Sequence, residues 1–255
     1  MASVKDIIVK PIKASVANEY VKKHHYSGKV VPNSQLHFGC FLNGVLGGVM
    51  QFGPSLDKKK VIGLVKNTGW NDFLELNRMA FGELLPKNSE SRCLAVAMRL
   101  IKKHYPNIKW IVSFADGCQC GDGTIYRASG FKLTQIKQNT SIRQNPETGE
   151  LMQDMQAFHL GILKEYKTWK KITGNMLRYI YFIDKSCEKD LTVPVLPFTM
   201  IDEKNARMYK GQKYMKDNAR LFQVQNTCVP ARDGGEIPTN AHQDSIIKKP
   251  ILSTM

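Results

Sequence analysis

Apolar runs of strand length dominate the first part of the chain. Residues 36–42 and 46–52 are two such runs, and they flank Asn43-Gly44. Asn-Gly is the strongest short signal for a β-hairpin, because both central residues of the turn need a positive φ. Residues 73–81 form the next run and predict another strand. The charge-free stretch 36–56 is therefore interpreted as a hairpin followed by a turn, and not as a membrane span.

Two segments have helical spacing instead. The first helix follows an expected strand at 7–12, has Ser15 as its candidate N-cap and ends near Gly28. The second begins at the serine-containing turn 88–91 and ends before Pro106. Its apolar stripe follows the i, i+3, i+4, i+7, i+11 spacing of an amphipathic helix and consists of Leu94, Ala97, Met98, Ile101 and Tyr105.

The region after this helix predicts the remaining strands. Residues 108–115 are rich in β-branched and aromatic side chains, which favours a buried strand, and Asp116 stands at its C-terminal end. A short helix is expected at 124–129, closed by Gly130 as a left-handed C-cap. Further strands are expected at 131–137 and 155–163, whereas 54–71 is expected to be a polar, lysine-rich loop.

Charge and cysteine content narrow the class of protein. The 37 Lys and Arg residues against 22 Asp and Glu give a net charge of +15. Such a balance favours a polyanionic partner, nucleic acid or an anionic membrane, although the charge could also serve solubility alone. No secretory signal opens the chain, and six cysteines in 255 residues are too sparse for a disulfide scaffold. We therefore expect a reduced, cytoplasmic protein without a membrane segment.

The order of elements from Glu75 to Phe131 carries the first resemblance. A helix N-terminus can bind a phosphate or pyrophosphate, and Ser89 and Ser91 add hydroxyl groups to that turn. The order is similar to the core of GNAT-type acyl-CoA transferases, and Tyr126 with the following Gly-Phe pair resembles that family's Tyr…Gly-Phe helix. The resemblance implies a mixed, mostly antiparallel sheet in which one parallel strand pair splays around acetyl-CoA. The turn at 86–92 lacks the family's usual glycines.

A second resemblance rests on several pieces that occur together in one order. These are His25-Tyr26-Ser27-Gly28-Lys29, the Asn43-Gly44 hairpin, Glu75-Leu76-Asn77-Arg78-Met79, Ser89–Arg92, Ser113-Phe114-Ala115-Asp116 and Tyr126–Phe131. Together they resemble the phage Mom family of DNA adenine modification proteins, a divergent branch of the acyltransferases, over about residues 5–165. The resemblance implies an enzyme that converts adenine to N6-(methylcarbamoyl)adenine with acetyl-CoA and so shields phage DNA from host restriction.

The two resemblances set the expected fold and domains. We expect an α/β (α+β), GNAT-like acyltransferase fold with a basic C-terminal extension. Residues 1–165 would form the catalytic domain, 166–227 a basic, aromatic extension packed on it, and 228–255 a loose tail.

The Mom resemblance also suggests roles for individual residues. Asp116 is a candidate base toward the adenine amine, and Tyr126 a candidate acid toward the leaving thiolate; alternatively Asp116 only closes a turn and Tyr126 packs in the core. His25 and Tyr26 are expected to line the pocket, or to end a helix without further function. Glu75 is a rival base, and regular alternation along 73–81 puts it opposite the face of Leu74 and Arg78, so only one of Glu75 and Arg78 is expected to face the cofactor. The candidate cofactor-binding residues are Arg78, Ser89, Ser91 and Arg92.

Metal and nucleic-acid contacts complete the expectations. Iron is a possible second cofactor, with His25, Tyr26, Asp116 and Tyr126 as candidate ligands. The pair Cys118-x-Cys120 supplies only two of the four ligands that a zinc site normally needs. The expected partner is double-stranded DNA with the target adenine flipped out, because N6 is paired inside a duplex. Trp70, Tyr166 and Trp169 would stack on that base or belong to the core. The candidate phosphate-binding residues are Lys58, Lys59, Lys60, Lys167, Lys170 and Lys171.

Two other functions remain open at this point. The chain could be an ordinary GNAT N-acetyltransferase of a protein or small amine, or a basic DNA-binding module without catalysis. The oligomeric state is also open, with a homodimer among the alternatives.

Overall fold

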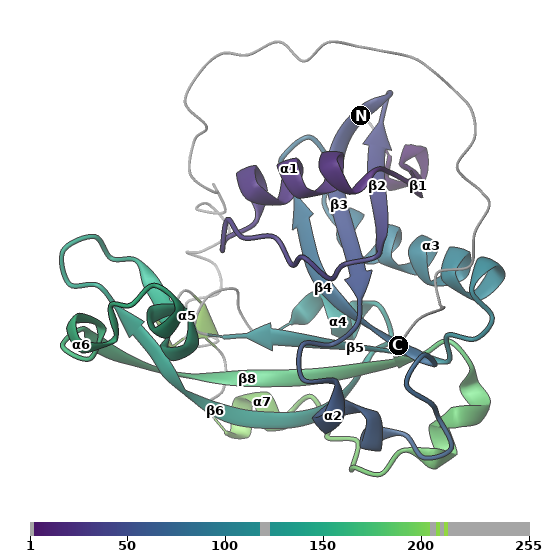
Figure 1. The fold of residues 1–255 in the computed structure, drawn as a ribbon. Helices are drawn as coiled ribbons and strands as arrows, with labels where there is room; N and C mark the ends of the chain where they lie inside the picture. Colours follow the sequence, from purple (N-terminus) through teal and green to yellow (C-terminus); the bar gives the residue numbers. More distant parts are fainter. Residues whose placement is uncertain (1–2, 118–122, 205–207, 210–211, 214–255) are drawn as a thin grey trace.

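A single eight-stranded sheet organises the molecule. The computed structural model of the chain describes residues 3–117, 123–204, 208–209 and 212–213 (Figure 1). The strand order is β1-β2-β3-β4-β5-β8-β6-β7. Only β4 and β5 pair in parallel among these neighbours, so the predicted mixed, mostly antiparallel sheet is confirmed. Within the described ranges no helix is long and apolar enough to cross a bilayer.

The strands and helices have the following bounds along the chain. The strands of the large sheet are β1 (Ile8–Pro11), β2 (Leu36–Leu42), β3 (Val45–Gly53), β4 (Phe73–Phe81), β5 (Trp110–Asp116), β6 (Lys132–Gln144), β7 (Leu151–Gln153) and β8 (Lys170–Phe182). The α-helices are α1 (Ala14–His24), α2 (Lys58–Val61), α3 (Ser89–His104), α4 (Thr124–Ala128), α5 (Asp154–His159), α6 (Leu163–Tyr166) and α7 (Met200–Glu203). The 3-10 helices among the described residues are η1 (Val4–Asp6), η2 (Ile62–Leu64) and η3 (Lys185–Asp190), and β9 (Met208–Tyr209) pairs with β10 (Gln212–Lys213).

The predicted hairpin is confirmed, and the first helix needs one correction. Asn43 and Gly44 have φ values of 50° and 81°, as the tight turn between β2 and β3 requires. The N-cap of α1 is Lys13, without a side-chain cap, and not Ser15. The helix begins early because the backbone of Ile12 still bonds to strand β2, and the chain turns directly after that bond.

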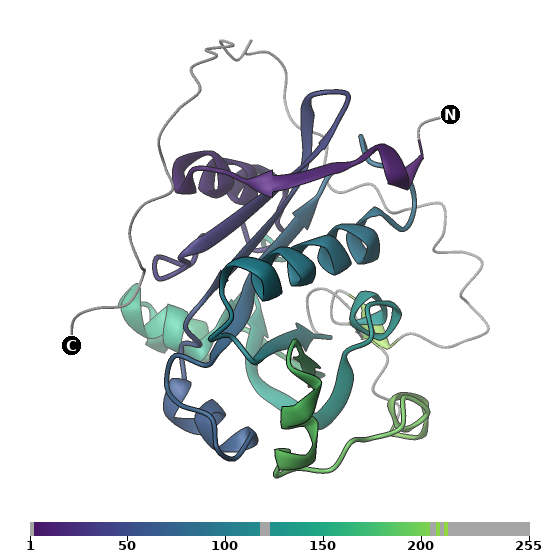
Figure 2. The ribbon, with the colours of Figure 1, turned by 90° about the vertical axis from the view of Figure 1, so that its right-hand side faces the viewer.

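Helices α1 and α3 cover opposite faces of the sheet (Figure 2). Ala17 and Val21 of α1 pack with Val49 and Ala80 in one cluster. The stripe of α3 packs in the main core with side chains from β2, β3, β5 and β8. The predicted amphipathic helix is thus confirmed as the cover of one sheet face.

Strand β4 contains a β-bulge at Asn77. Phe52 of β3 pairs with Leu76 and Gln51 pairs with Arg78, so Asn77 has no opposite residue. A bulge inserts one residue into a strand and so reverses the alternation of faces beyond it. The apolar β4 side chains that pack on the α3 side are accordingly Leu74, Leu76, Met79 and Phe81.

This bulge corrects one expectation about the site. Regular alternation placed Arg78 on the face of Leu74 and opposite Glu75. Because of the bulge, Arg78 lies on the face away from α3, where its charge acts on Glu75. Glu75 and Arg78 therefore lie on the same face of the sheet.

The second half of the chain departs further from the sequence-based expectation. The segment 54–71 contains α2 and η2 rather than loop alone, and 155–163 contains most of α5, a turn and the first residue of α6 instead of forming the last strand. The last strand of the large sheet along the chain is β8, which lies between β5 and β6. Residues 170–182, expected in a C-terminal extension, therefore supply a central strand, while 228–255 lie outside the described residues.

Strands β4 and β5 pair at one end only. Their parallel register consists of three pairs and ends at Glu75 and Val112. Beyond that point β4 continues with β3 alone and β5 with β8 alone. The two strands therefore diverge, as the resemblance implied, and leave a gap at the carboxyl ends of both.

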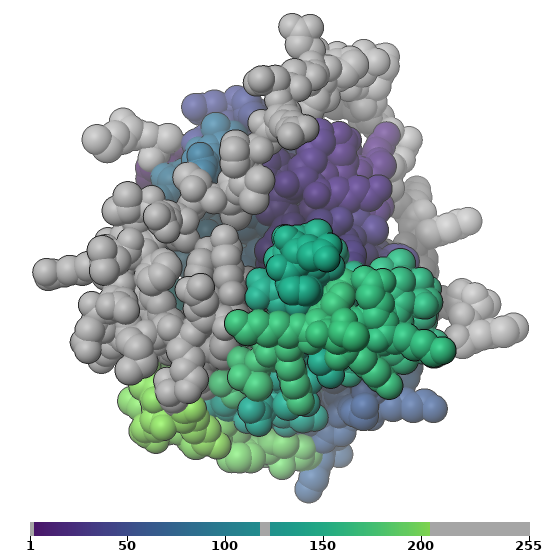
Figure 3. All heavy atoms as spheres, turned by 90° about the vertical axis from the view of Figure 1, so that its left-hand side faces the viewer, coloured from purple at the N-terminus to yellow at the C-terminus, as the bar shows by residue number. Residues whose placement is uncertain are grey.

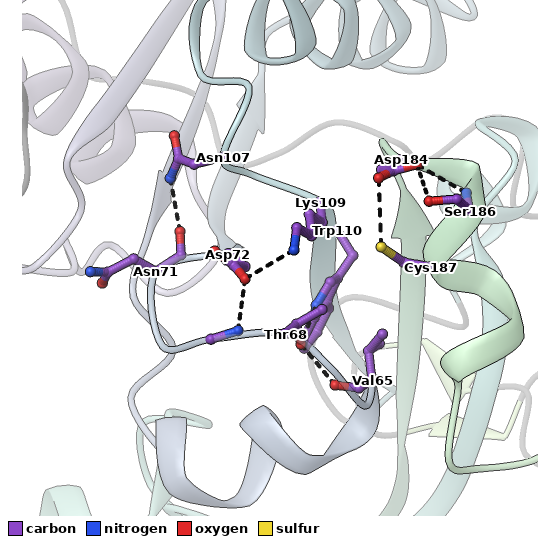
Figure 4. Close-up of polar contacts among 11 residues, drawn as sticks. Val65, Thr68, Asn71, Asp72, Asn107, Lys109, Trp110, Asp184, Ser186 and Cys187 are labelled. Carbon is purple, nitrogen blue, oxygen red and sulfur yellow. Dashed lines mark hydrogen bonds and ion pairs between the residues drawn. The ribbon is translucent and has the colours of Figure 1, made fainter.

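Strands β4 and β5 thus form a V that is closed where they begin and open at their carboxyl ends. Polar contacts hold the closed end of this V together (Figure 4). Lys109, just before β5, forms an ion pair of 3.3 Å with Asp72, just before β4. Asn107 donates to the carbonyl of Asn71 (2.9 Å), and the Trp110 indole N–H donates to Thr68 Oγ1 (3.3 Å). The strands are thus held together at their start and separate only past these contacts.

Candidate active site

Asp116 lies at the open end of the V. It is the last residue of β5, pairs with Met176 of β8 and is 7% exposed. A carboxylate at this position borders the gap between the diverging strands. The position agrees with the sequence, which placed Asp116 at a strand end.

Tyr126, on α4, packs beside Tyr179 of β8, which pairs with Ser113 of β5. Its ring lies 5.0 Å from that of Tyr179 on β8 and 5.3 Å from that of Phe131. Gly123, with φ at 75°, starts the helix, and a Cβ there would come within 2.7 Å of the Tyr179 ring and 2.8 Å of the Tyr126 ring. Glycine is therefore required at 123, because any side chain would displace the two tyrosines.

Ser113 supplies an unusual group beside these rings. It pairs with Tyr179 across β5 and β8 and is completely buried. Its Oγ has no hydrogen-bond partner among the described residues. A buried hydroxyl without a partner costs free energy, which makes Ser113 a candidate to bond to a ligand.

His25 and Tyr26 follow α1 and form a second group. Their rings are 4.1 Å apart. The backbone N–H of Ser27 donates to His25 Nδ1 (3.2 Å), and the Ser27 hydroxyl lies 2.8 Å from the same nitrogen. Burial, aided by the positive charge of Arg78, lowers the pKa of His25 to about 3. At neutral pH the imidazole is therefore uncharged, and its Nδ1 is occupied as an acceptor.

Arg78 joins this group from β4. Its Nε–H donates to the Lys29 carbonyl (2.9 Å) and its Nη1–H to the carbonyl of Asn77 (2.7 Å). Burial raises the pKa of Glu75, while hydrogen bonding to Ser55 and the charge of Arg78 oppose that rise. Arg78 thus links the loop after α1 to a half-buried carboxyl group on β4.

The N-terminal turn of α3 holds the other cofactor candidates. Asn88 is the N-cap, with φ at 69° and no side-chain cap. The Ser89 hydroxyl donates to the Pro86 carbonyl, and that of Ser91 donates to the Asn88 carbonyl (3.2 Å). Ser89 is buried, whereas Ser91 and Arg92 are half-exposed. The structure groups these three residues together and places Arg78 with His25 and Tyr26 instead.

The comparisons with known proteins decide the family. The profile of the Mom protein family matches residues 6–200. The chain is 31% identical over 220 residues to the protein named "Methylcarbamoylase mom" of Escherichia phage Mu, which covers 83% of this chain and 85% of that one. The chain belongs to the Mom family. The resemblance read from the sequence is confirmed, and the Mom family protein described here is a transferase.

Two solved structures that resemble this Mom family protein are named as acetyltransferases. An N-acetyltransferase from Staphylococcus aureus superposes with a TM-score of 0.42 at 12% identity, covering 70% of this chain and 99% of that one. An IAA acetyltransferase from Bacillus cereus gives a TM-score of 0.41 at 12% identity, covering 69% and 99%.

The lysines predicted to contact DNA differ in their surroundings. Lys58 is buried, with its Nζ 4.3 Å from the ring centre of Trp70 and 5.5 Å from that of Phe73. Burial lowers the pKa of Lys58. Its ammonium group therefore stabilises the Mom fold through aromatic contacts. The candidate lysines that are exposed are Lys59, Lys60, Lys167, Lys170 and Lys171.

The residues considered for base stacking divide in a similar way. Tyr166 is 1% and Trp169 5% exposed, and both belong to a small core cluster. They are core residues, so they do not meet a DNA base. Trp70 is 48% exposed, though one face of its ring lies against Lys58.

No group of three or more His, Cys, Asp or Glu side chains converges within the part of the chain that the structure describes. His25 Nδ1 already accepts a backbone N–H. Cys118 and Cys120 lie outside the described residues.

Sequence reasoning gave too little weight to Glu75, Ser27 and Ser55 in this Mom family site. Glu75 and Arg78 share one face because of the bulge at Asn77, and no local sequence signal marks that bulge. Ser27 supports His25 through a contact two residues away, which the spacing His-x-Ser could have suggested. Ser55 acts on Glu75 through the tertiary fold alone.

Proposed function

We propose that this Mom family protein modifies adenine N6 in double-stranded DNA with a two-carbon unit from acetyl-CoA, giving N6-(methylcarbamoyl)adenine. The observation that carries this proposal is the 31% identity to a methylcarbamoylase over most of both chains. The net charge of +15 supports a DNA substrate. The modification would protect phage DNA from restriction in the cytoplasm of the host.

The shape of the sheet supports an extended thioester cofactor. The pairing of β4 with β5 ends at Glu75 and Val112, and the next residue of β5 is Ser113, whose buried hydroxyl has no hydrogen-bond partner among the described residues. The first turn of α3 has no side-chain cap, so its N–H groups and the half-exposed Ser91 and Arg92 suit a pyrophosphate. When bound, acetyl-CoA supplies the activated acetyl group.

The residues at the open end of the V divide the proton transfers. The Asp116 carboxylate would accept a proton from the exocyclic amine of adenine, and the Tyr126 hydroxyl would donate one to the thiolate that leaves when the thioester is cleaved. A bond from N6 to the acetyl methyl carbon removes two electrons from that carbon, and the terminal amide takes its nitrogen from a second donor. The overall reaction therefore requires an oxidant and a nitrogen donor as co-substrates beside acetyl-CoA. His25, neutral at physiological pH, and Tyr26 line the approach of the base beside Arg78. The Arg78 charge keeps the half-buried Glu75 from a still higher pKa.

Binding of the duplex is assigned to exposed lysines on two segments. Lys59 and Lys60 lie on α2, and Lys167, Lys170 and Lys171 lie between α6 and the start of β8. Phosphate contacts of this kind supply affinity without sequence preference. The target adenine must leave the duplex because its N6 is hydrogen-bonded there.

Mass spectrometry of nucleosides from DNA of cells that express the chain tests this proposal. We expect N6-(methylcarbamoyl)deoxyadenosine with the wild type, and at least a ~100-fold lower yield with Asp116→Ala or Tyr126→Phe, because each variant removes a proton-transfer group. Both variants should keep their thermal stability and DNA affinity. Tyr105→Phe, at the far end of α3, is the matched control and should give the wild-type yield.

The nucleoside analysis, together with calorimetry and DNA-binding measurements, separates this proposal from the alternative functions. N6-acetyldeoxyadenosine would indicate ordinary acetyl transfer. Unmodified DNA together with acetyl-CoA binding in calorimetry would indicate an acetyltransferase of another amine. Unmodified DNA without acetyl-CoA binding, but with salt-dependent DNA binding, would indicate a binding module.

A further inference from the structure

The hairpin of α5 and α6 carries exposed apolar side chains that the site described above does not use. Met155 is 64%, Phe158 61% and Leu160 59% exposed. Met155 and Phe158 are three residues apart on α5 and therefore share one face of that helix. Three large apolar side chains exposed within six residues indicate a binding surface rather than a solvated helix.

A small core of its own holds this hairpin rigid. Ala157 packs against Tyr166 and Trp169 in that core. The Tyr166 hydroxyl lies 2.8 Å from the Ser141 carbonyl oxygen, and one Arg143 N–H group donates to the carbonyl of Trp169 (3.1 Å). The apolar side chains are thus presented on a fixed support and not on a loose loop.

The hairpin stands beyond the catalytic end of β5. The last β5–β8 pair is Asp116 with Met176, whereas residues 170–175 of β8 continue with β6 alone. Six strand residues at about 3.3 Å each extend this arm about 20 Å past Asp116, close to the width of a DNA duplex. Figure 1 shows α5 and α6 on the arm, and in Figure 3 its green surface lies beside the purple surface of the N-terminal elements.

Charge around the hairpin favours a polyanion. The exposed lysines on this arm are Lys164, Lys167, Lys170 and Lys171. The segment 164–171 contains one acidic residue, Glu165. Asp154 on α5 is engaged with the Tyr166 hydroxyl, and Glu147 and Glu150 lie in the turn between β6 and β7. Exposed apolar side chains next to a lysine-rich segment match a duplex, whose phosphates are charged and whose base steps are apolar.

A cavity of about 290 Å³ lies next to Phe158 on this surface. Its lining consists of Arg143, Asp154, Met155, Phe158, Leu163, Tyr166 and Lys167. The two exposed apolar side chains therefore border a concave surface with basic groups at its edge.

We propose that the α5–α6 hairpin is the element that unstacks the target adenine. Met155 and Phe158 enter the duplex at a base step, and the lysines of the arm hold the phosphates on either side. This inference rests on the proposed function, because it takes double-stranded DNA as the substrate. Apolar side chains inserted at a base step compensate the few kcal/mol that unstacking costs.

Fluorescence of 2-aminopurine tests the proposal without any need for catalysis. Duplexes carry the fluorescent base in place of adenine in every combination of flanking bases, and the full-length chain is titrated in. We expect the wild type to raise the fluorescence. Met155→Ala/Phe158→Ala should lose at least about fivefold of that rise, while its affinity for the duplex changes by less than about threefold, because the phosphate contacts remain.

Ile8→Ala is the matched control, since Ile8 is 62% exposed on the strand at the opposite edge of the sheet. It should behave like the wild type. No fluorescence rise with the wild type, or an undiminished rise with the double variant, would overturn the proposal. So would sedimentation showing a wild-type dimer that the double variant loses, because the surface would then join two copies.

Failure of the proposed function gives a different result. If the wild type unstacks 2-aminopurine but cellular DNA contains no modified adenine, the hairpin keeps its role and the assigned chemistry is wrong. If DNA is modified but the double variant unstacks and modifies duplex DNA normally, the chemistry stands and the inference about the hairpin fails.

Discussion

Individual residues in the site are defined more by their surroundings than by their type. His25 is the clearest case, because burial and Arg78 keep a normally titrating side chain neutral. The sequence could identify His25 and Tyr26 as a candidate pair. It could not give their protonation state, which depends on burial and on a charge 53 positions away in the chain.

The stability of the protein should fall in mild acid because of His25. Between pH 6.5 and about 3 the unfolded chain binds a proton at this imidazole and the folded chain does not. The unfolded state is therefore favoured as the pH drops, by about 1–2 kcal/mol at pH 5 from this group. Above pH 7 the group has no such effect.

Urea unfolding at pH 7 and pH 5 measures this effect. In His25→Asn the free energy of unfolding should fall by about 1–2 kcal/mol less between pH 7 and pH 5 than in the wild type. The control, His104→Asn, changes an exposed histidine at the end of α3 and should keep the wild-type difference. Equal pH dependence in wild type and His25→Asn would contradict the burial of a neutral imidazole.

Arg78→Gln should raise the pKa of His25. Removing the neighbouring positive charge relieves one of the two causes of the low value, but burial, the larger cause, remains. The pKa should therefore rise above about 3 and stay below 6.5. NMR titration of the imidazole resonances measures it, with Arg99→Gln on the exposed side of α3 as the control. An unchanged pKa would separate Arg78 from the group around His25.

At the scale of elements, the sequence predicted the features that depend only on residues close together along the chain. The Asn43-Gly44 turn, the stripe of α3 and the strand ending at Asp116 were all predicted, because each depends on neighbours along the chain. The bulge at Asn77 and the central position of β8 depend on partner strands, and the sequence could not show them. The segment 155–163 was wrongly predicted as a strand because its apolar residues suit either period.

The lysines of α2 allow structural and binding roles to be told apart. Lys58→Ala removes the contact with Trp70 and Phe73 and should lower the free energy of unfolding by about 1 kcal/mol. It should leave the salt dependence of DNA binding unchanged.

Lys59→Ala/Lys60→Ala is the matched variant, because both side chains are exposed. It should alter stability by less than about 0.5 kcal/mol and reduce the salt slope of DNA binding by up to about two units. Fluorescence anisotropy at several salt concentrations measures the slope. A larger loss of slope with Lys58→Ala than with the double variant would contradict these assignments.

On the scale of the whole molecule, the sheet brings three distant parts of the chain to one end. The loop after α1 reaches β4 through the hydrogen bond from Arg78 to Lys29, β4 and β5 separate past Glu75 and Val112, and the arm of β6 and β8 extends past Asp116. The clamp between Asp72 and Lys109 holds the other end closed. The proposed account needs this arrangement, because a thioester cofactor and an extruded base must reach the same carboxylate.

Isotope labelling tests that central claim most directly. Cells that express the chain are grown so that both acetyl carbons of acetyl-CoA are ¹³C, and nucleosides from their DNA are analysed by mass spectrometry. The account predicts a methylcarbamoylated deoxyadenosine heavier by both labelled carbons, which is lost with Asp116→Ala. A modified deoxyadenosine without the label, or DNA in which no adenine is modified, would contradict it.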